Sequence, residues 1–210
     1  MPEFLNIGVF ASGRGSNFRA ILESIKSGKI RNARISVVIS NNSLAGALQN
    51  ARDNSIPAFH ISRMQFNSED DYTNAILNRL EEYKVNFIAL AGYMKKIDNR
   101  IVRKFKNRMI NIHPALLPKF GGEGMYGMHV HEAVIAAHET ESGATVHLVD
   151  EEYDHGSVIL QKKIDVAPED TAESLAKKVL TVEHQVYPEV IRLFSEGKVV
   201  FKNGKTEILK

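Results

Sequence analysis

Short apolar blocks alternate along the chain with longer segments whose apolar residues repeat at helical spacing. Leu5–Phe10 is an apolar run bounded by polar residues, which predicts a buried strand. Ser16–Ser27 follows, and its apolar positions 18, 21, 22 and 25 fall on one helical face. The same pattern predicts strands over residues 5–10, 35–39, 58–61, 87–91, 109–112, 145–149 and 158–164. It predicts helices over residues 16–27, 44–54, 68–84, 129–137 and 170–194, with a short basic helix before residue 109.

Strands that alternate with helices are typical of βαβ units, in which the strands are parallel and the crossovers right-handed. We therefore expect an α/β protein with a doubly wound, mostly parallel twisted sheet. The last third has two strands and one long helix, which predicts an antiparallel C-terminal extension of the same sheet. No repeat, low-complexity stretch or linker interrupts the pattern, which favours a single domain over residues 1–210.

Polar residues at the ends of these segments predict where helices and turns begin. Ser68 can cap the third helix, with Asp71 completing a variant capping box. Asp170, with Glu173 three residues later, is expected to open the final helix. After that helix, Asn203-Gly204 predicts the turn of a short hairpin.

The composition narrows the class of protein. The chain has 210 residues, with 27 Lys and Arg against 25 Asp and Glu and a formal net charge of +2. Bulk charge therefore does not hold it to nucleic acid or membrane. Cysteine is absent, which excludes disulfides, thiolate metal sites and a cysteine nucleophile. No apolar run reaches the ~18 residues that span a bilayer. The N-terminus also lacks the basic segment of a signal peptide. For these two reasons we expect a cytoplasmic protein.

A glycine-rich turn, Ala11–Phe18, links the first predicted strand to the first helix. Glycines let backbone N–H groups approach an anion, the helix N-terminus adds a favourable dipole, and Ser16 and Asn17 add a cap and side-chain donors. A dinucleotide fingerprint would need Gly where Phe18 stands, and the acidic residue expected ~20 positions later is missing. No Gly-Lys-Ser/Thr follows, which excludes a P-loop. The turn predicts a site for one phosphate, the alternative being a tight turn without a ligand.

Two polar residues interrupt the fifth predicted strand near its end. Asn111 and His113 are two residues apart, so both side chains point to the same face of the sheet. A strand inside a parallel sheet should be apolar throughout, and its C-terminal end is where such sheets bind ligands. Pro114 and Pro118 stiffen the following segment. An amide beside an imidazole can stabilise an oxyanion and move a proton. The alternative is that Asn111 and His113 form a hydrogen-bonded pair whose role is to hold the following loop in place.

Two further polar positions point to the same chemistry, and a third is a separate candidate for binding a ligand. His147 interrupts the apolar strand Thr145–Val149, and Asp154 follows in a polar turn, where a carboxylate can orient an imidazole. Glu183 falls within the apolar stripe of the final helix, which Pro188 is expected to kink. A carboxylate on a buried face needs a partner, either a ligand group or a buried cation.

Six segments carry a resemblance to a known family. They are similar, in order, to the motifs of the glycinamide ribonucleotide transformylases, the folate-dependent formyltransferases of purine synthesis. The segment around His113 is specific to folate formyltransferases, and the phosphate turn narrows the resemblance to this branch. The matching segments are Ser12–Asn17, Leu90–Met94, Asn111–Pro118, Ser142–His147, Asp154–Ile159 and Glu183–Pro188.

The resemblance implies a Rossmann-like formyltransferase fold and a reaction. The family transfers the formyl group of its co-substrate, 10-formyltetrahydrofolate, to the amine of 5′-phosphoribosylglycinamide in the synthesis of IMP. The amine attacks directly through a tetrahedral intermediate, and no metal takes part. The expected partners are these two small molecules, with no nucleic acid or membrane, and the expected chain is a monomer or a homodimer.

The resemblance also implies catalytic roles. Asn111 and protonated His113 would stabilise the tetrahedral oxyanion. Asp154 would position His113 and relay protons through water, and His147 would support this network. Glu183 would contact the ribonucleotide.

The resemblance assigns both substrates to parts of the chain. A phosphate-binding half covers about residues 1–95, and a folate and catalytic half about residues 96–210. Lys95-Lys96 and the glycine-rich stretch Gly121–Gly127 depart from better-known members, and the latter suggests a mobile flap. The implied phosphate ligands are Gly15, Ser16 and Asn17, and the implied folate contacts are Leu90, Tyr93, Met94, Lys95, Lys96, Ile97, Glu152 and Tyr153.

Other enzyme classes are alternatives. Methionyl-tRNA formyltransferases and formyltetrahydrofolate deformylases share the His113 segment, but they carry an added C-terminal or N-terminal domain that we do not expect here. A metal hydrolase is a more distant alternative, because imidazole is the commonest metal ligand. Its candidate ligands are His129, His131, His147 and His155.

A basic segment offers a non-enzymatic alternative. Seven basic residues and one acid, Asp98, lie between Lys95 and Arg108, and such a patch could bind nucleic acid. The other interpretation is the solvated face of an amphipathic helix with Ile97, Ile101, Val102 and Phe105 buried.

Overall fold

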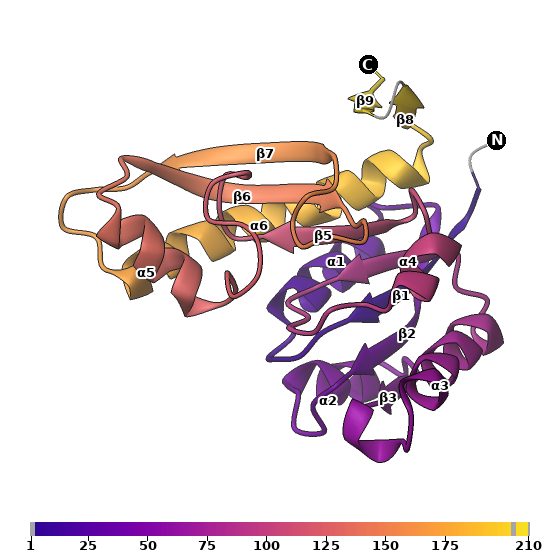
Figure 1. Cartoon of the computed structure of the whole chain (residues 1–210). Coiled ribbons are helices and arrows are strands. Elements are labelled where there is room, and N and C mark those ends of the chain that lie inside the picture. The colour runs from indigo at the N-terminus through magenta and orange to yellow at the C-terminus, as the bar shows by residue number, and fades with distance from the viewer. Residues whose placement is uncertain (1–2, 203–204, 210) are drawn as a thin grey trace.

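The computed structural model describes residues 3–202 and 205–209, in which strands and helices alternate (Figure 1). The strands of the main sheet are β1 Leu5–Phe10, β2 Ala33–Ser40, β3 Ala58–His60, β4 Phe87–Leu90, β5 Met109–His113, β6 Glu141–Leu148 and β7 Val158–Asp165. The α-helices are α1 Ser16–Lys26, α2 Gly46–Asp53, α3 Glu69–Glu82, α4 Asn99–Lys104, α5 Met128–Ala136 and α6 Ala172–Ser195. A 3₁₀ helix, η1 Arg63–Gln65, and a hairpin of β8 Val199–Lys202 and β9 Lys205–Ile208 complete the described elements.

The seven-stranded sheet has the order β3-β2-β1-β4-β5-β6-β7. β1 to β5 pair in parallel, whereas β6 runs antiparallel to both β5 and β7. The α/β class, the mostly parallel sheet and its antiparallel C-terminal extension are therefore confirmed. The predicted strands and helices are present with small shifts at their ends. The largest shift is in β6, which begins at Glu141 because Glu141 and Ser142 pair with Asp165 and Ile164 of β7.

The predicted helix starts were partly right. The Oγ of Ser68 accepts from the Asp71 N–H at 3.0 Å, which confirms that cap. The prediction for α6 was wrong by one residue, because Thr171 is the cap and exchanges hydrogen bonds with Ser174. The Asp170 carboxylate instead accepts a hydrogen bond from the Ala167 N–H at 2.8 Å, so it stabilises the loop before the helix. The predicted Asn203-Gly204 turn lies outside the described residues, although β8 and β9 on either side of it pair antiparallel.

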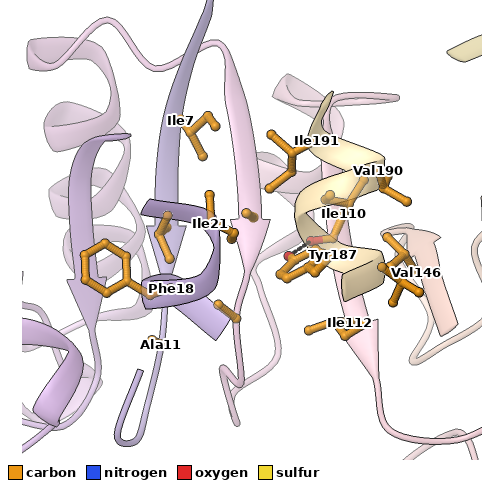
Figure 2. Packing of buried hydrophobic residues seen from close by; sticks show 14 of the residues in the cluster. Ile7, Ala11, Phe18, Ile21, Ile110, Ile112, Val146, Tyr187, Val190 and Ile191 are labelled. Atoms are coloured by element: carbon orange, nitrogen blue, oxygen red, sulfur yellow. Dashed lines mark hydrogen bonds between the residues drawn. The ribbon is translucent and has the colours of Figure 1, made fainter. Parts of the chain in front are cut away.

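Helices cover both faces of the sheet. Residues of α1, α2, α5 and α6 share one apolar core with the strands, and residues of α3 and α4 share the other. Alternation along β1 places Val9 in the first core and Phe10 in the second. Figure 2 shows the first core, where Phe18 and Ile21 of α1 lie over β1. Within the described ranges, no helix is both long and apolar enough to cross a membrane.

Tyr187 fixes the long helix α6 against the sheet. Its side chain is fully buried, and its hydroxyl lies 2.9 Å from the carbonyl oxygen of Leu90 and 3.2 Å from that of Ile110 (Figure 2). Leu90 ends β4, and Ile110 directly precedes Asn111 in β5. Because a buried hydroxyl needs a partner, this contact sets both the rotation of α6 and its position along β4 and β5. The helix continues through Pro188.

We predict that Tyr187→Phe lowers the free energy of unfolding by about 1 to 2 kcal/mol, because two buried carbonyl oxygens lose a donor. Denaturant unfolding of both proteins measures the difference. The control is Tyr83→Phe, at a partly exposed position, which should change stability by less than about 0.5 kcal/mol. Equal stability of the Tyr187→Phe variant and the native chain would contradict the assignment.

Candidate active site

A cavity of about 640 Å³ lies at the carboxyl ends of the central strands. The chain reverses its direction of strand addition between β1 and β4, and open α/β sheets bind ligands beside such a reversal. The cavity receives side chains from the loops after β1, β4 and β5, from the β6–β7 turn and from α6. Among its lining residues are Asn17, Leu90, Tyr93, Met94, Lys95, Lys96, Ile97, Asn111, His113, His147, Glu152, Tyr153, Asp154 and Glu183.

The structure thus brings nearly all of the predicted site residues to one cavity. The catalytic candidates, the folate candidates and Glu183 all line it. The exceptions belong to the phosphate turn, where Asn17 faces this cavity but Ser16 faces a neighbouring groove. Gly15 lies behind both and packs on α2.

Asn111, His113 and His147 form the polar centre of the cavity. Asn111 and His113 project from β5, and His147 lies directly opposite Asn111 on the antiparallel strand β6. The amide Nδ2 of Asn111 donates to the ring Nε2 of His147 at 3.1 Å. The Nδ1–H of His147 donates to the Leu148 carbonyl oxygen at 2.7 Å, which leaves Nε2 as the acceptor in the neutral ring.

Asp154 approaches this centre from the β6–β7 turn. Its backbone has a φ of 53°, in the left-handed region where aspartate is tolerated. One carboxylate oxygen, Oδ2, accepts from the Gly122 N–H at 3.0 Å and lies 3.5 Å from Nδ1 of His113; Oδ1 lies 3.5 Å from Nε2 of His147. Burial acts to raise the pKa of Asp154, but the neighbouring rings of His147 and His113, with the Gly122 N–H, outweigh it and lower that pKa. The carboxylate is therefore ionised at neutral pH.

The buried ring of His113 has a defined tautomer. Its Nε2–H donates to the Phe120 carbonyl oxygen at 2.8 Å, so the neutral ring turns its free Nδ1 toward Asp154. Burial lowers the pKa of His113, and the Asp154 carboxylate offsets only part of that effect. The resting imidazole is thus neutral, and any proton it gains arrives at Nδ1 beside a carboxylate.

Glu183 meets the phosphate turn through one short hydrogen bond. The Nδ2–H of Asn17 donates to Oε2 of Glu183 at 2.6 Å, and both side chains are buried. Burial raises the pKa of Glu183 to about 7, because this hydrogen bond offsets only part of the lost hydration. In the described part of the chain, Oδ1 of Asn17 has no hydrogen-bond partner. A polar wall between α1 and α6 therefore offers an unused acceptor and a carboxyl group to a ligand.

The phosphate turn differs in one detail from the prediction. Gly15, rather than a Ser16 or Asn17 side chain, caps α1, with a φ of 78° and no side-chain hydrogen bond to the cap. A Cβ at Gly15 would lie 2.8 Å from Cα of Ala47, so only glycine fits between the turn and α2. The predicted side-chain cap is therefore wrong. The first turn of α1 keeps its N–H groups for another partner, as an anion site requires.

Several lining residues were missed by the sequence prediction. Arg14, Met125, Tyr126 and Leu180 face the cavity. Arg14 lies in the predicted phosphate turn and Met125 and Tyr126 in the predicted flap, but none of the four was singled out. His131 also lines the cavity, buried on α5, and its Nδ1 has no hydrogen-bond partner among the described residues. Burial, and then the neighbouring His113 ring, lower the pKa of His131. His129 is exposed, with its ring centroid 5.3 Å from that of Tyr126.

The basic segment before β5 forms the surface of an amphipathic helix. Arg103 pairs with Glu151 at 2.7 Å, Arg100 with Asp70 at 2.9 Å and Lys104 with Glu81 at 3.5 Å. These pairs neutralise much of the charge that would attract nucleic acid. The predicted apolar face is confirmed, since Ile97, Ile101, Val102 and Phe105 are buried. Among residues 3–202 and 205–209, no three His, Asp or Glu side chains are placed to hold a metal ion together.

Comparison with known proteins defines the class. Residues 5–191 match the Formyl transferase family. The chain is 37% identical to phosphoribosylglycinamide formyltransferase of Haemophilus influenzae over 198 residues, which are 94% of this chain and 91% of the relative. It is 40% identical to the chloroplastic phosphoribosylglycinamide formyltransferase of Vigna unguiculata, covering 97% of this chain but 65% of that longer relative.

Solved structures agree with these relatives. Glycinamide ribonucleotide transformylase 1 of Symbiobacterium toebii superposes with a TM-score of 0.91 at 37% identity, over 99% of this chain and 95% of that one. The chain therefore belongs to the phosphoribosylglycinamide formyltransferase branch of the formyl transferase family. A formyltetrahydrofolate deformylase of Pseudomonas syringae has a TM-score of 0.87 at 23% identity, which shows a shared fold.

We predict that Glu183→Gln makes stability less dependent on pH. A folded pKa of about 7, above the ordinary 4.5, means that native stability is full below pH 4.5 and falls as pH rises through 7. At pH 8.5 the variant should be more stable by about 2 to 3 kcal/mol, whereas at pH 4.5 the two should be similar. Thermal and urea unfolding at both pH values measure this, and parallel pH profiles would contradict it.

Proposed function

We propose that this chain transfers the formyl group of 10-formyltetrahydrofolate to the amine of 5′-phosphoribosylglycinamide, in the synthesis of IMP. The observation that carries the proposal is the meeting of Asn111, His113 and Asp154 in the middle of the cavity. The phosphate turn lies on one side of this centre, and an apolar recess lies on the other. The two sides suit a phosphorylated amine and a flat aromatic co-substrate.

The formyl folate occupies the recess after β4. Leu90 and Ile97 form buried apolar walls, and the Tyr93 ring packs edge-on against Phe10 with centroids 5.3 Å apart. The N–H of Met94 donates to Oγ of Ser12 at 2.9 Å, which ties this recess to the phosphate turn. The pterin ring then lies on the apolar walls, and backbone groups of both loops determine its orientation.

The cation at the mouth of the recess is held by an aromatic ring. Nζ of Lys96 lies 5.4 Å from the ring centroid of Tyr153, within the range of a cation–π contact. Lys95 beside it is exposed. The departure from the family at Lys95-Lys96 thus leaves the buried walls unchanged and alters only the rim.

The reaction needs an oxyanion stabilised and one proton moved. The amine lone pair attacks the formyl carbon, a C–N bond forms, and the carbonyl electron pair moves to oxygen. The Asn111 amide and His113 stabilise this oxygen. When the intermediate collapses, the bond from carbon to N10 of the folate breaks, and N10 takes the proton that the amine loses, relayed by Asp154 through water.

Electrostatics favour proton uptake at His113 as the oxyanion forms. The resting ring is neutral, and Asp154 faces its free Nδ1 at 3.5 Å. A negative oxygen nearby raises the proton affinity of the ring when stabilisation is needed. His147 keeps Asn111 in place, since its own Nδ1–H is held by the main chain.

Residues from both halves of one domain bind the two substrates. Residues 1–95 supply the phosphate turn with Gly15, Ser16 and Asn17, and residues 96–210 supply the catalytic centre; the two halves share the folate contacts equally. Glu183 of the second half contacts the ribonucleotide at its hydroxyl or amine, beside Asn17 of the first. No metal is needed for this chemistry. A cytoplasmic location, and a monomer or homodimer, stay predictions.

An acceptor-dependence assay tests the proposal. Purified protein is given 10-formyltetrahydrofolate with and without 5′-phosphoribosylglycinamide, and folate deformylation is followed by absorbance. We expect turnover only with the ribonucleotide, and none in His113→Ala, which removes the buried imidazole. Turnover without an acceptor would instead assign water as the nucleophile, as in a deformylase. No turnover in either tube would overturn both activities.

We predict that Asp154→Asn lowers kcat by about 10²- to 10⁴-fold, because the amide neither favours a proton on His113 nor relays one. KM for each substrate should change by less than about threefold, because the side-chain shape is kept. Steady-state kinetics with both substrates measure the split. Asp165→Asn, at an exposed position of β7, is the matched control and should keep native kcat. An unchanged kcat in Asp154→Asn would remove Asp154 from the mechanism.

A further inference from the structure

A second hollow lies directly behind the phosphate turn. It is a groove of about 470 Å³ between α1 and α6, and it is separate from the central cavity. Ser16 lines the groove while Asn17 lines the cavity, and on α6 His184 lines the groove while Glu183 lines the cavity. The hydrogen bond between Asn17 and Glu183 is therefore the wall between the two hollows. An anion on the first turn of α1 lies at the top of this wall and can be reached from both sides.

The groove adds positive charge beside the turn, whose own cation, Arg14, lines the central cavity instead. Arg19 and Lys29 line it, together with one carboxylate, Glu23. In the described part of the chain, neither Arg19 nor Lys29 forms an ion pair with a carboxylate. Unpaired cations beside a set of free helix N–H groups offer an anion both charge and hydrogen-bond donors.

Helix geometry directs Arg19 toward the turn. Its N–H donates to the Gly15 carbonyl oxygen at 3.0 Å, so Arg19 lies one turn after Gly15 on α1. Side chains on a helix lean toward its N-terminus and cover the residues three and four positions before them. Arg19 lines the groove together with Ser16, so its guanidinium is within reach of the first turn of α1, where the proposed phosphate lies. Glu23 lies one turn further from it.

His184 shows that the charge of Arg19 acts on this side of the wall. Burial lowers the pKa of His184, the Arg19 charge lowers it further, and Glu23 opposes both. The ring is therefore neutral at pH 7 and adds no cation of its own. Among the residues that line the groove, Arg19 is the charged donor nearest in sequence to the phosphate turn.

Resting on the function proposed above, we propose that Arg19 binds the 5′-phosphate of the ribonucleotide from the α1–α6 groove. The backbone N–H groups of the first turn hold the phosphate from below, and the guanidinium supplies bidentate donors and charge from the groove side. Arg19 thereby sets the preference for a phosphorylated acceptor over the corresponding nucleoside. The reacting amine is on the other side of the wall, so Arg19 acts on binding and not on the chemical step.

Kinetics with two acceptors test the assignment. Arg19→Gln should raise KM for 5′-phosphoribosylglycinamide by about tenfold or more, the size expected for a charged hydrogen bond to phosphate. Its kcat and its KM for the folate should change by less than twofold. KM for the unphosphorylated nucleoside should be unchanged, whereas a structural defect would raise both. The matched control is Arg31→Gln, exposed and outside both hollows, which should leave all constants at native values.

Direct binding separates this proposal from the function itself. Calorimetric titration with inorganic phosphate needs no turnover, and Arg19→Gln should weaken its binding by a factor similar to the change in KM. An unchanged KM for the ribonucleotide, or equal losses for nucleotide and nucleoside, would overturn the role of Arg19. If the native chain formylates no ribonucleotide, the proposed function fails, and the phosphate titration alone then decides whether Arg19 holds an anion.

Discussion

The position of α6 across the sheet is the constraint on which the site depends. The buried Tyr187 hydroxyl bonds to the carbonyl oxygens of Leu90, at the end of β4, and of Ile110, near the start of β5. Glu183 lies one helical turn before Tyr187, on the same face of α6. The Tyr187 contact that orients α6 therefore also places Glu183 within hydrogen-bond distance of Asn17 on α1. Without this contact, apolar packing alone would permit several rotations of α6, because hydrophobic contacts are not directional.

The catalytic centre is a set of buried polar groups, and hydrogen bonds with the main chain offset the free-energy cost of removing these groups from water. His113 and His147 each give one ring N–H to a main-chain carbonyl oxygen, which fixes the tautomer of both rings. Their other nitrogens then face Asp154 and Asn111. The Gly122 N–H donates a hydrogen bond to the Asp154 carboxylate, which both rings approach. Each bond adds only about 1 kcal/mol of net stability, but an unsatisfied group would cost more, so the main chain holds the site in one arrangement.

The sequence predicted the parts of this structure that follow from periodicity. Strand order aside, each α-helix and each strand of the main sheet was expected, whereas the 3₁₀ helix η1 was not. Asn111 and His113 were conspicuous because polar residues rarely occupy a central parallel strand. Residues whose role depends on long-range packing were harder to find. Asp154 resembles an ordinary turn aspartate, and the resemblance to a family identified it. Thr171 and Asp170 are both good caps, and the bond from Ala167 decides between them.

Arg14 and Arg19 show why the remaining residues could not be predicted. Each lies on a loop or an exposed helix position where charged and polar residues are common, so no local pattern separates a ligand contact from a solvated side chain. What distinguishes them is the hollow they face, and that depends on how α1, α5 and α6 pack together. Ser16 and Asn17 are the clearest example, because these adjacent residues of one motif line different hollows: Ser16 the α1–α6 groove and Asn17 the central cavity. A motif therefore locates a binding site along the chain, whereas the packing of helices far apart in sequence decides which side of the ligand each residue contacts.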